Sequence, residues 1–405
     1  MNGLSKFFPT PSDKMGTLWA LSSIKDACII EYGPGGTTHY SMEGIFKING
    51  EISASTYTTH ISEDDVVMGD TERLRKTILE VDEVYKPKYI FVIASSLISV
   101  IGTDIQGVVY ELTPQVNAKL IVYQSGGFKG DYTVGMAQVL SDLAVQVVQP
   151  CSVKEERSYN LLGCGIDDYR YAANIKAIQT VLRESLGLHC KSVWTAESSI
   201  DEIEASSTAA LNIVMRQEAF TCAELLKEHF GTPHIYAHPI GYTATIEMIE
   251  AAAEALGLVP DATYMETAKK KMRRVTMSVK SRLRQMQDKS LVLSGGYDAV
   301  RAYERFLCDD LGFALKCALI NHMKTAENAS EHYKFNVTEG DKESAAAENP
   351  MLLVGDAVLL QYAKNTPFTL QIQNPNIDKI IITAHKSFMC FDGADDIAEK
   401  LMNGT

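Results

Sequence analysis

The sequence of 405 residues has no long hydrophobic run and no excess of positive charge, and each absence excludes a class of protein. Its longest apolar stretch, Tyr89–Gly102, is shorter than the roughly 20 residues that cross a bilayer. Acidic residues outnumber basic ones by 51 to 38, so no nucleic-acid partner is expected. The first residues lack the charged and apolar segments of a secretion signal. We therefore expect a cytoplasmic protein without membrane contact.

The sequence also lacks the cysteine patterns of disulfide scaffolds and common metal sites. None of its eight cysteines lies in a CxxC pair, which indicates free thiols in a reducing compartment. Cys28 lies within a predicted strand and Cys164 at the end of another, and we interpret both as packing residues. The cysteine count alone therefore predicts no metal site.

Short β-branched runs alternate with helical patterns along most of the chain, which is typical of βαβ units with parallel sheets. The chain is roughly two to three times the size of an ordinary domain. Breaker clusters at Gln149–Cys151 and Val259–Asp261 divide it. We predict an α/β fold of three Rossmann-like domains, residues 1–150, 151–260 and 261–405, with parallel sheets around a central cleft. A polar surface insertion at 325–349 is expected to have little order.

The predicted elements follow this alternation. Strands are predicted near Ala27–Tyr32, Tyr89–Ala94, Lys119–Tyr123, Tyr159–Gly163, Ser192–Trp194, Leu211–Met215, His234–Ala237, Leu291–Leu293 and Met351–Val354. Helices are predicted near Thr71–Tyr85, Val134–Ala144, Asp168–Leu186, Ala219–Phe230, Thr243–Leu256 and Ala262–Asp288. The last helix carries eight basic residues between Lys269 and Arg284. We interpret them as a solvated face, with contact to an acidic partner as the alternative.

Several short motifs, in a fixed order, resemble those of nitrogenase component 1 subunits. They are the loop Tyr32-Gly33-Pro34-Gly35-Gly36-Thr37 (His-Gly-Pro-x-Gly-Cys in the family), the segment Ile61–Leu74, the stretch from Lys86 to Asp104, the turn Pro239-x-Gly241-x-x-x-Thr245 and the sequence Phe391–Ala394. Together they run from about residue 12 to residue 401, so the resemblance covers nearly the whole chain. We expect the loop glycines to serve backbone geometry rather than anion binding.

The resemblance implies three positions where the family has cysteines that hold an iron–sulfur cluster between two subunits. Here they are Ser12, Thr37 and Ser96. Iron in such clusters prefers thiolate, and a hydroxyl is a poor ligand near neutral pH. We therefore expect no cluster on the chain alone. The alternative is a 4Fe-4S cluster shared with a partner subunit, with Thr37 as an oxygen ligand.

Subunits of this family that bear a larger cofactor hold it through a middle-domain cysteine and a histidine near the C-terminus. The matching positions here are Met215 and Ile381, neither of which can bind iron as thiolate or imidazole. Use of the neighbouring Cys222 and His385 would need a shifted alignment and is not expected. The chain accordingly resembles the β-type subunit.

By resemblance, the chain would be the β-type subunit of a nitrogenase-like, ATP-dependent oxidoreductase, paired with a homologous α-type subunit in a heterotetramer. Electrons would come from an ATP-driven iron protein that docks near Gly33, Gly35, Gly36, Gly102 and Asp104. Two alternatives stay open: a scaffold or binding protein for a metal cofactor or a tetrapyrrole, and a fold recruited to a redox-free role. The sequence indicates neither catalytic residues nor a substrate.

Overall fold

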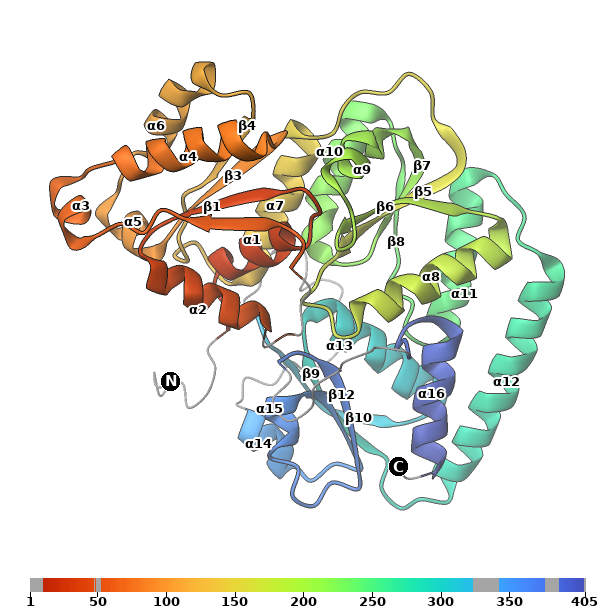
Figure 1. Cartoon of the computed structure of the whole chain (residues 1–405). Helices are drawn as coiled ribbons and strands as arrows, with labels where there is room; N and C mark the ends of the chain where they lie inside the picture. The colour runs from red at the N-terminus through yellow and green to blue at the C-terminus, as the bar shows by residue number, and fades with distance from the viewer. Residues whose placement is uncertain (1–9, 47, 49–51, 323–341, 376–385, 404–405) are drawn as a thin grey trace.

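The computed structural model describes residues 10–46, 48, 52–322, 342–375 and 386–403. Figure 1 shows three α/β units, each built on a four-stranded sheet. All strand pairs described in these sheets are parallel. In every sheet the second strand lies at one edge, followed by the first, third and fourth. The predicted α/β fold with three parallel sheets is therefore confirmed, with one sheet in each predicted domain. No helix in the described part of the chain is long and apolar enough to span a membrane.

The first unit contains the sheet β2-β1-β3-β4. Its strands are β1 (Cys28–Tyr32), β2 (Ser55–Thr58), β3 (Tyr89–Ala94) and β4 (Lys119–Tyr123). Its helices are α1 (Asp13–Ser22), α2 (Gly35–Phe46), α3 (Glu63–Met68), α4 (Glu72–Tyr85), α5 (Ser96–Ile101), α6 (Ile105–Leu112) and α7 (Tyr132–Gln146), with the 3-10 turn η1 (Thr113–Gln115). The inner strands β1 and β3 are wholly buried, because helices cover both faces of a parallel sheet.

Helices α1 and α7 pack closely because glycines face one another's backbone. A Cβ on Gly16 would lie 1.8 Å from the carbonyl oxygen of Tyr132, and one on Gly135 would lie 1.8 Å from that of Asp13. Both approaches exclude any side chain larger than hydrogen. The start of α1 is therefore held against the start of α7.

The second unit contains the sheet β6-β5-β7-β8. Its strands are β5 (Glu155–Cys164), β6 (His189–Thr195), β7 (Ala209–Val214) and β8 (His234–Tyr236). Its helices are α8 (Tyr171–Leu186), α9 (Ile200–Glu204), α10 (Phe220–Phe230) and α11 (Gly241–Leu256), with the turns η2 (Ala205–Thr208) and η3 (Gln217–Ala219). Asn160 and Asn212 pair across β5 and β7, where Asn160 Nδ2 donates to Asn212 Oδ1 at 2.8 Å. This bond satisfies polar groups in the middle of a buried sheet.

The third unit contains the sheet β10-β9-β11-β12. Its strands are β9 (Ser290–Gly295), β10 (Ala314–Ile320), β11 (Leu352–Asp356) and β12 (Phe368–Gln373). Its helices are α12 (Ala262–Arg284), α13 (Tyr297–Glu304), the π-helical η4 (Arg305–Leu311), α14 (Lys342–Ala347), α15 (Ala357–Leu360) and α16 (Cys390–Asn403). The edge strands β10 and β12 were not predicted, because alternating exposure interrupts their apolar residues.

Most of the predicted polar insertion lies outside the described residues. Its residues 342–347 form α14, where Ala345 and Ala346 pack in one cluster with Val292 and Leu353. This helix differs from the little order predicted for residues 325–349, because two buried alanines in a polar stretch are a weak apolar signal.

The basic helix α12 mostly faces solvent. Lys269 pairs with Glu250 at 2.9 Å and Lys271 pairs with Asp395, while Arg273, Arg282 and Arg284 are exposed. This exposure agrees with the interpretation of a solvated face.

Two shared cores join the units into one body. One cluster of buried apolar residues spans the first and second units, and another spans the second and third. Helices α8, α11, α12 and α16 contact one another, and Figure 1 shows them on the side of the molecule where the second and third units meet. The second unit therefore shares an apolar core with each of the other two.

Candidate functional site

Two of the three predicted cluster positions lie against one loop. Ser96 begins α5, and its Oγ donates a hydrogen bond to the carbonyl oxygen of Gly126 at 2.6 Å. Ser12 precedes α1, and its Oγ lies 3.1 Å from the place that a Cβ on Gly127 would take. Gly127 has a φ of 104°, a conformation that favours glycine. The glycine loop after β4 therefore brings Ser12 and Ser96 together.

Thr37 lies in the first turn of α2, after the short connection Gly33-Pro34 that follows β1. Its Oγ1 donates to the carbonyl oxygen of Pro34 at 2.8 Å, which closes the first turn of α2. A Cβ on Gly33 would lie 2.5 Å from Ser95 Oγ and 3.1 Å from Thr37 Oγ1. Gly33 therefore packs against Ser95 at the start of α5. Because Gly33 also contacts Thr37 and Ser95 directly precedes Ser96, Thr37 and Ser96 lie on neighbouring segments. We call Ser12, Thr37 and Ser96 the hydroxyl positions.

The five residues predicted to dock an iron protein differ in their exposure to solvent. Gly36, Gly102 and Asp104 are exposed, and Asp104 caps α6 by accepting a hydrogen bond from the Gly107 amide at 2.9 Å. Gly33 is buried, and a Cβ on Gly35 would lie 2.6 Å from the ring of His60. The first three are therefore accessible to a partner, whereas the last two position the loop.

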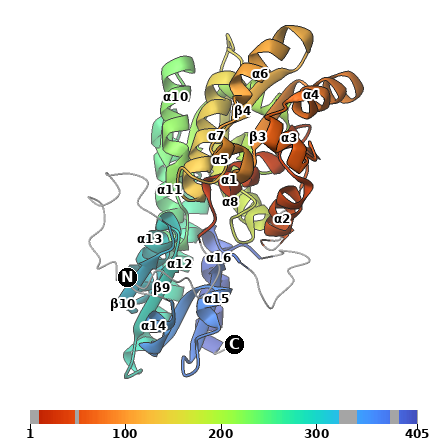
Figure 2. The ribbon, with the colours of Figure 1, turned by 90° about the vertical axis from the view of Figure 1, so that its left-hand side faces the viewer.

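Exposed apolar side chains flank the hydroxyl positions. They are Leu97, Val100 and Ile101 on α5 and Phe128 in the loop after β4, and we call them the apolar surface. Val100 and Phe128 are 68% and 66% exposed, which leaves large apolar area in water. Figures 1 and 2 show α5 on the same side of the first unit as α2 and α3, which expose Phe46 and Met68. Grouped apolar side chains of this kind indicate a surface that binds another macromolecule.

A buried ion pair lies behind the hydroxyl positions. Lys14 on α1 donates from Nζ to Glu31 Oε1 at 2.5 Å and to Ser41 Oγ at 3.2 Å. The side chains of Lys14 and Glu31 are 7% and 0% exposed. Sequence reasoning missed this pair, because the two residues are 17 positions apart in separate elements. The pair ties α1 to β1 and α2, which carry Ser12 and Thr37.

The residues at the hydroxyl positions do not fit an iron–sulfur cluster held by this chain alone. Ser96 and Thr37 use their hydroxyl hydrogens on backbone carbonyls, and neutral hydroxyls are poor ligands for cluster iron. Across the described ranges, no three His, Cys, Asp or Glu side chains are grouped so that they could hold a metal ion.

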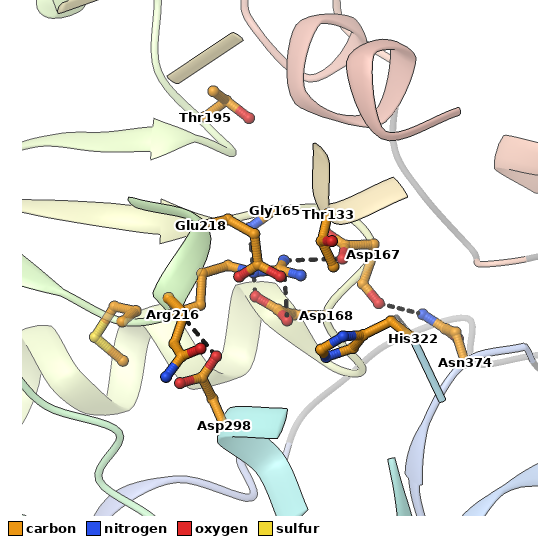
Figure 3. Close-up of polar contacts among 12 residues, drawn as sticks. Thr133, Gly165, Asp167, Asp168, Thr195, Arg216, Glu218, Asp298, His322 and Asn374 are labelled. Carbon is orange, nitrogen blue, oxygen red and sulfur yellow. Dashed lines mark hydrogen bonds and ion pairs between the residues drawn. The ribbon is translucent and has the colours of Figure 1, made fainter. Parts of the chain in front are cut away.

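A second polar site lies where strands of the second and third sheets end. Asp167 and Asp168 follow β5, Arg216 and Glu218 follow β7, and Asp298 lies at the start of α13 after β9 (Figure 3). We call these five residues the polar centre. The carboxyl ends of parallel strands are where α/β proteins usually bind ligands.

Three carboxylates surround Arg216. Its Nη1 lies 2.8 Å from Asp167 Oδ2 and 3.7 Å from Asp168 Oδ1, and its Nε donates to Glu218 Oε2 at 3.0 Å. Burial alone would lower the pKa of Arg216, but Asp167 and Glu218 raise it well above its ordinary value. Arg216 is therefore a permanent cation, as guanidinium groups in proteins generally are.

Two carboxyl groups of the polar centre have raised pKa values. Burial raises the pKa of Asp168 to about 7, with a further contribution from Asp167, although Arg216 opposes it. The Asp168 side chain is nevertheless 36% exposed, so solvent can exchange protons with it. Burial and the neighbouring Glu218 also raise the pKa of Asp298. Groups with shifted pKa values that lie close together are candidates for a functional site.

Hydrogen bonds across the polar centre join the second and third units. Asp298 accepts from the Gln217 amide at 3.0 Å and from the Tyr236 hydroxyl at 2.5 Å. Asn374, after β12, donates from Nδ2 to the carbonyl oxygen of Asp167 at 2.9 Å. The polar centre is therefore built by residues that are far apart in the sequence.

None of the five residues of the polar centre was predicted from the sequence, although one predicted position, Met215, is next to Arg216. Met215, the predicted counterpart of the family's cofactor cysteine, is buried directly before Arg216, and Cys222 is buried in the apolar core. Ile381 and His385 lie outside the described residues. The signal that could have found the site is the acidic pair directly after a predicted strand.

The fold and these two sites define a three-sheet α/β protein with its polar residues at the strand ends. The chain belongs to the family described as nitrogenase component 1 type oxidoreductase, whose model matches residues 12–405. The predicted resemblance is therefore confirmed.

Relatives and a solved structure agree with this membership. The chain is 26% identical over 246 residues to the nitrogenase iron-molybdenum cofactor biosynthesis protein NifE of Methanococcus maripaludis, covering 60% of this chain and 51% of the relative. It is 24% identical over 242 residues to the nitrogenase molybdenum-iron protein alpha chain of Clostridium pasteurianum, covering 58% and 45%. The chain thus spans about half the length of the curated relatives it matches. A solved structure titled nitrogenase Cp1 at pH 6.5 superposes with a TM-score of 0.80 at 17% identity, covering 100% of this chain and 94% of that one.

Proposed function

We propose that this chain is the β-type subunit of a nitrogenase-like, ATP-dependent reductase and that it binds a homologous α-type subunit through the apolar surface. The supporting observation is that Ser12 and Ser96, two of the family's cluster positions, meet at one loop beside exposed apolar side chains. The interface then either lacks a cluster or shares a 4Fe-4S cluster whose thiolates come from the partner, with Thr37 as the oxygen ligand of this chain. An ATP-driven iron protein docks at Gly36, Gly102 and Asp104, and the complex works in the cytoplasm.

Co-expression with the product of the neighbouring gene tests the subunit contact. Phe128→Asp places a charge in the apolar surface. The amount of partner recovered with this variant should be at least about tenfold lower than with the unchanged chain. Val259→Asp is the matched control, because Val259 is 89% exposed and lies after α11 in the second unit. Equal co-purification of both variants would refute the contact.

Anaerobic iron and sulfide analysis of the same preparations tests the shared cluster. Iron should appear only in the co-purified complex, and Thr37→Ala should lower its content or change its electron paramagnetic resonance signal. If Thr37→Ala changes neither the iron content nor the signal, all ligands of the cluster come from the partner. If neither sample contains iron, the shared cluster is refuted.

A scaffold or binding protein for a metal cofactor or a tetrapyrrole is the second candidate function. It is favoured by the replacement of three thiols by hydroxyls and by similarity to proteins named for cofactor biosynthesis. A scaffold predicts a complex that contains no cluster of its own yet binds a supplied cofactor. Electron transfer from an iron protein to the purified complex would contradict it.

A further inference from the structure

The polar centre holds more carboxyl groups than the guanidinium of Arg216 can pair, and burial raises the pKa of two of them, Asp168 and Asp298. Three carboxyl groups surround the guanidinium of Arg216, and a fourth, Asp298, lies beside them and accepts hydrogen bonds from the Gln217 amide and the Tyr236 hydroxyl. His238, which donates or accepts at the Met215 carbonyl, does not offset their charge, because burial lowers its pKa. Buried negative charge without a counter-charge is unfavourable.

Two buried oxygen atoms at this junction also lack a donor. Asp167 Oδ1 and Asn374 Oδ1 accept no hydrogen bond from any residue that the structure describes. The Asp167 side chain is 91% buried, and Asn374 donates to the backbone of the same residue. Buried acceptors in native proteins nearly always have a partner, so these two indicate a bound donor.

The chemistry of the polar centre does not suit the cluster cofactor of the family. The resemblance predicts the position of the cofactor cysteine at Met215, whose thioether cannot form a thiolate. Thiolate-held iron–sulfur clusters are anionic, whereas this site is already negative. The carboxyl groups are also not grouped so that the described part of the chain could hold a metal ion. A molecule that carries both positive charge and N–H groups satisfies the charge balance and the unpaired oxygens together.

We propose that the polar centre binds a small organic cation with N–H donors, of the amine, amidine or guanidine class. Its charge offsets the excess of carboxylates, and its N–H groups donate to Asp167 Oδ1 and Asn374 Oδ1. The cation reaches the site from the side of Asp168. The Asp168 side chain is 36% exposed, whereas those of Asp167 and Glu218 are almost fully buried. This proposal concerns a second site and does not depend on the subunit contact proposed above.

Titration calorimetry and thermal unfolding of the full chain with agmatine test the proposal. Agmatine should bind and raise the Tm, because a ligand that binds only the folded state stabilises it. Tetramethylammonium chloride at equal ionic strength carries the charge without N–H groups and should have no such effect. Asp167→Asn should weaken agmatine binding at least about tenfold, which corresponds to about 1.4 kcal/mol. The matched control, Asp64→Asn, removes the same charge from an exposed site on α3 and should bind agmatine normally.

Two further measurements keep the proposal testable if Asp167→Asn does not fold. Asp298→Asn removes one charge but keeps an acceptor for Tyr236, and it should also weaken binding. In the unchanged chain, agmatine should bind more weakly at pH 5 than at pH 8, because Asp168 takes up a proton over this range. No binding, equal binding to all variants, or equal binding of tetramethylammonium would overturn the proposal and identify the polar centre as an ionic contact between two units.

Discussion

The hydroxyl positions and the polar centre both lie in or beside connections that follow parallel strands, yet they carry different kinds of chemistry. The hydroxyl positions themselves are neutral, the neighbouring Val100 and Phe128 are exposed, and the ion pair of Lys14 and Glu31 lies buried behind them. In the polar centre the side chains are charged and, apart from Asp168, nearly buried. The exposed apolar groups beside the hydroxyl positions favour a surface that binds a partner. The buried charged groups of the polar centre favour a ligand site, because buried charge must be balanced.

Removal of Arg216 should break the polar centre with the largest effect. Arg216→Leu leaves three carboxylates facing one another, and the loss of stability should be about 5 kcal/mol at pH 8. At pH 5.5 the loss should be smaller, because Asp168 is then protonated and repels its neighbours less. Urea unfolding at both pH values measures this. Equal losses at the two pH values would contradict the assigned charges.

Removal of Lys14 should test whether the region of the hydroxyl positions also depends on buried charge. Lys14→Met leaves Glu31 buried without its cation, and the expected loss is about 3 kcal/mol in urea unfolding. The double change Lys14→Met with Glu31→Leu removes both charges and should restore most of the loss. A double variant as unstable as the single one would show that packing of Lys14, and not its charge, matters.

The smallest expected effect concerns Asp168. Because its folded pKa is about 7 and an unfolded aspartate has one near 3.9, the folded chain binds the extra proton between these values. The contribution of Asp168 to stability should therefore fall as pH rises from about 4 to 7, and Asp168→Asn should remove that fall. The difference should stay below about 1 kcal/mol, because solvent screens a side chain that is 36% exposed. Thermal unfolding from pH 5 to pH 8 measures it, and parallel curves for both chains would contradict the raised pKa.

Much of the fold could be predicted because its signals are local. The inner strand β3 is a continuous apolar run and the inner strands β1 and β11 each begin with three apolar residues, and burial on both faces explains that pattern. The edge strand β2 was missed because its residues Ser55–Thr58 are polar and partly exposed. The long helix α12 was predicted, but it ends at Arg284 rather than near Asp288.

The sequence by itself determined the parallel α/β architecture and the family, because both depend on residue type and on order along the chain. Only the tertiary structure decided that Ser12 and Ser96 share the loop at Gly127, and that Asp167, Arg216 and Asp298 form one charged site. The physical reason is that charge balance, burial and hydrogen-bond satisfaction depend on neighbours in space, and these neighbours come from different sheets.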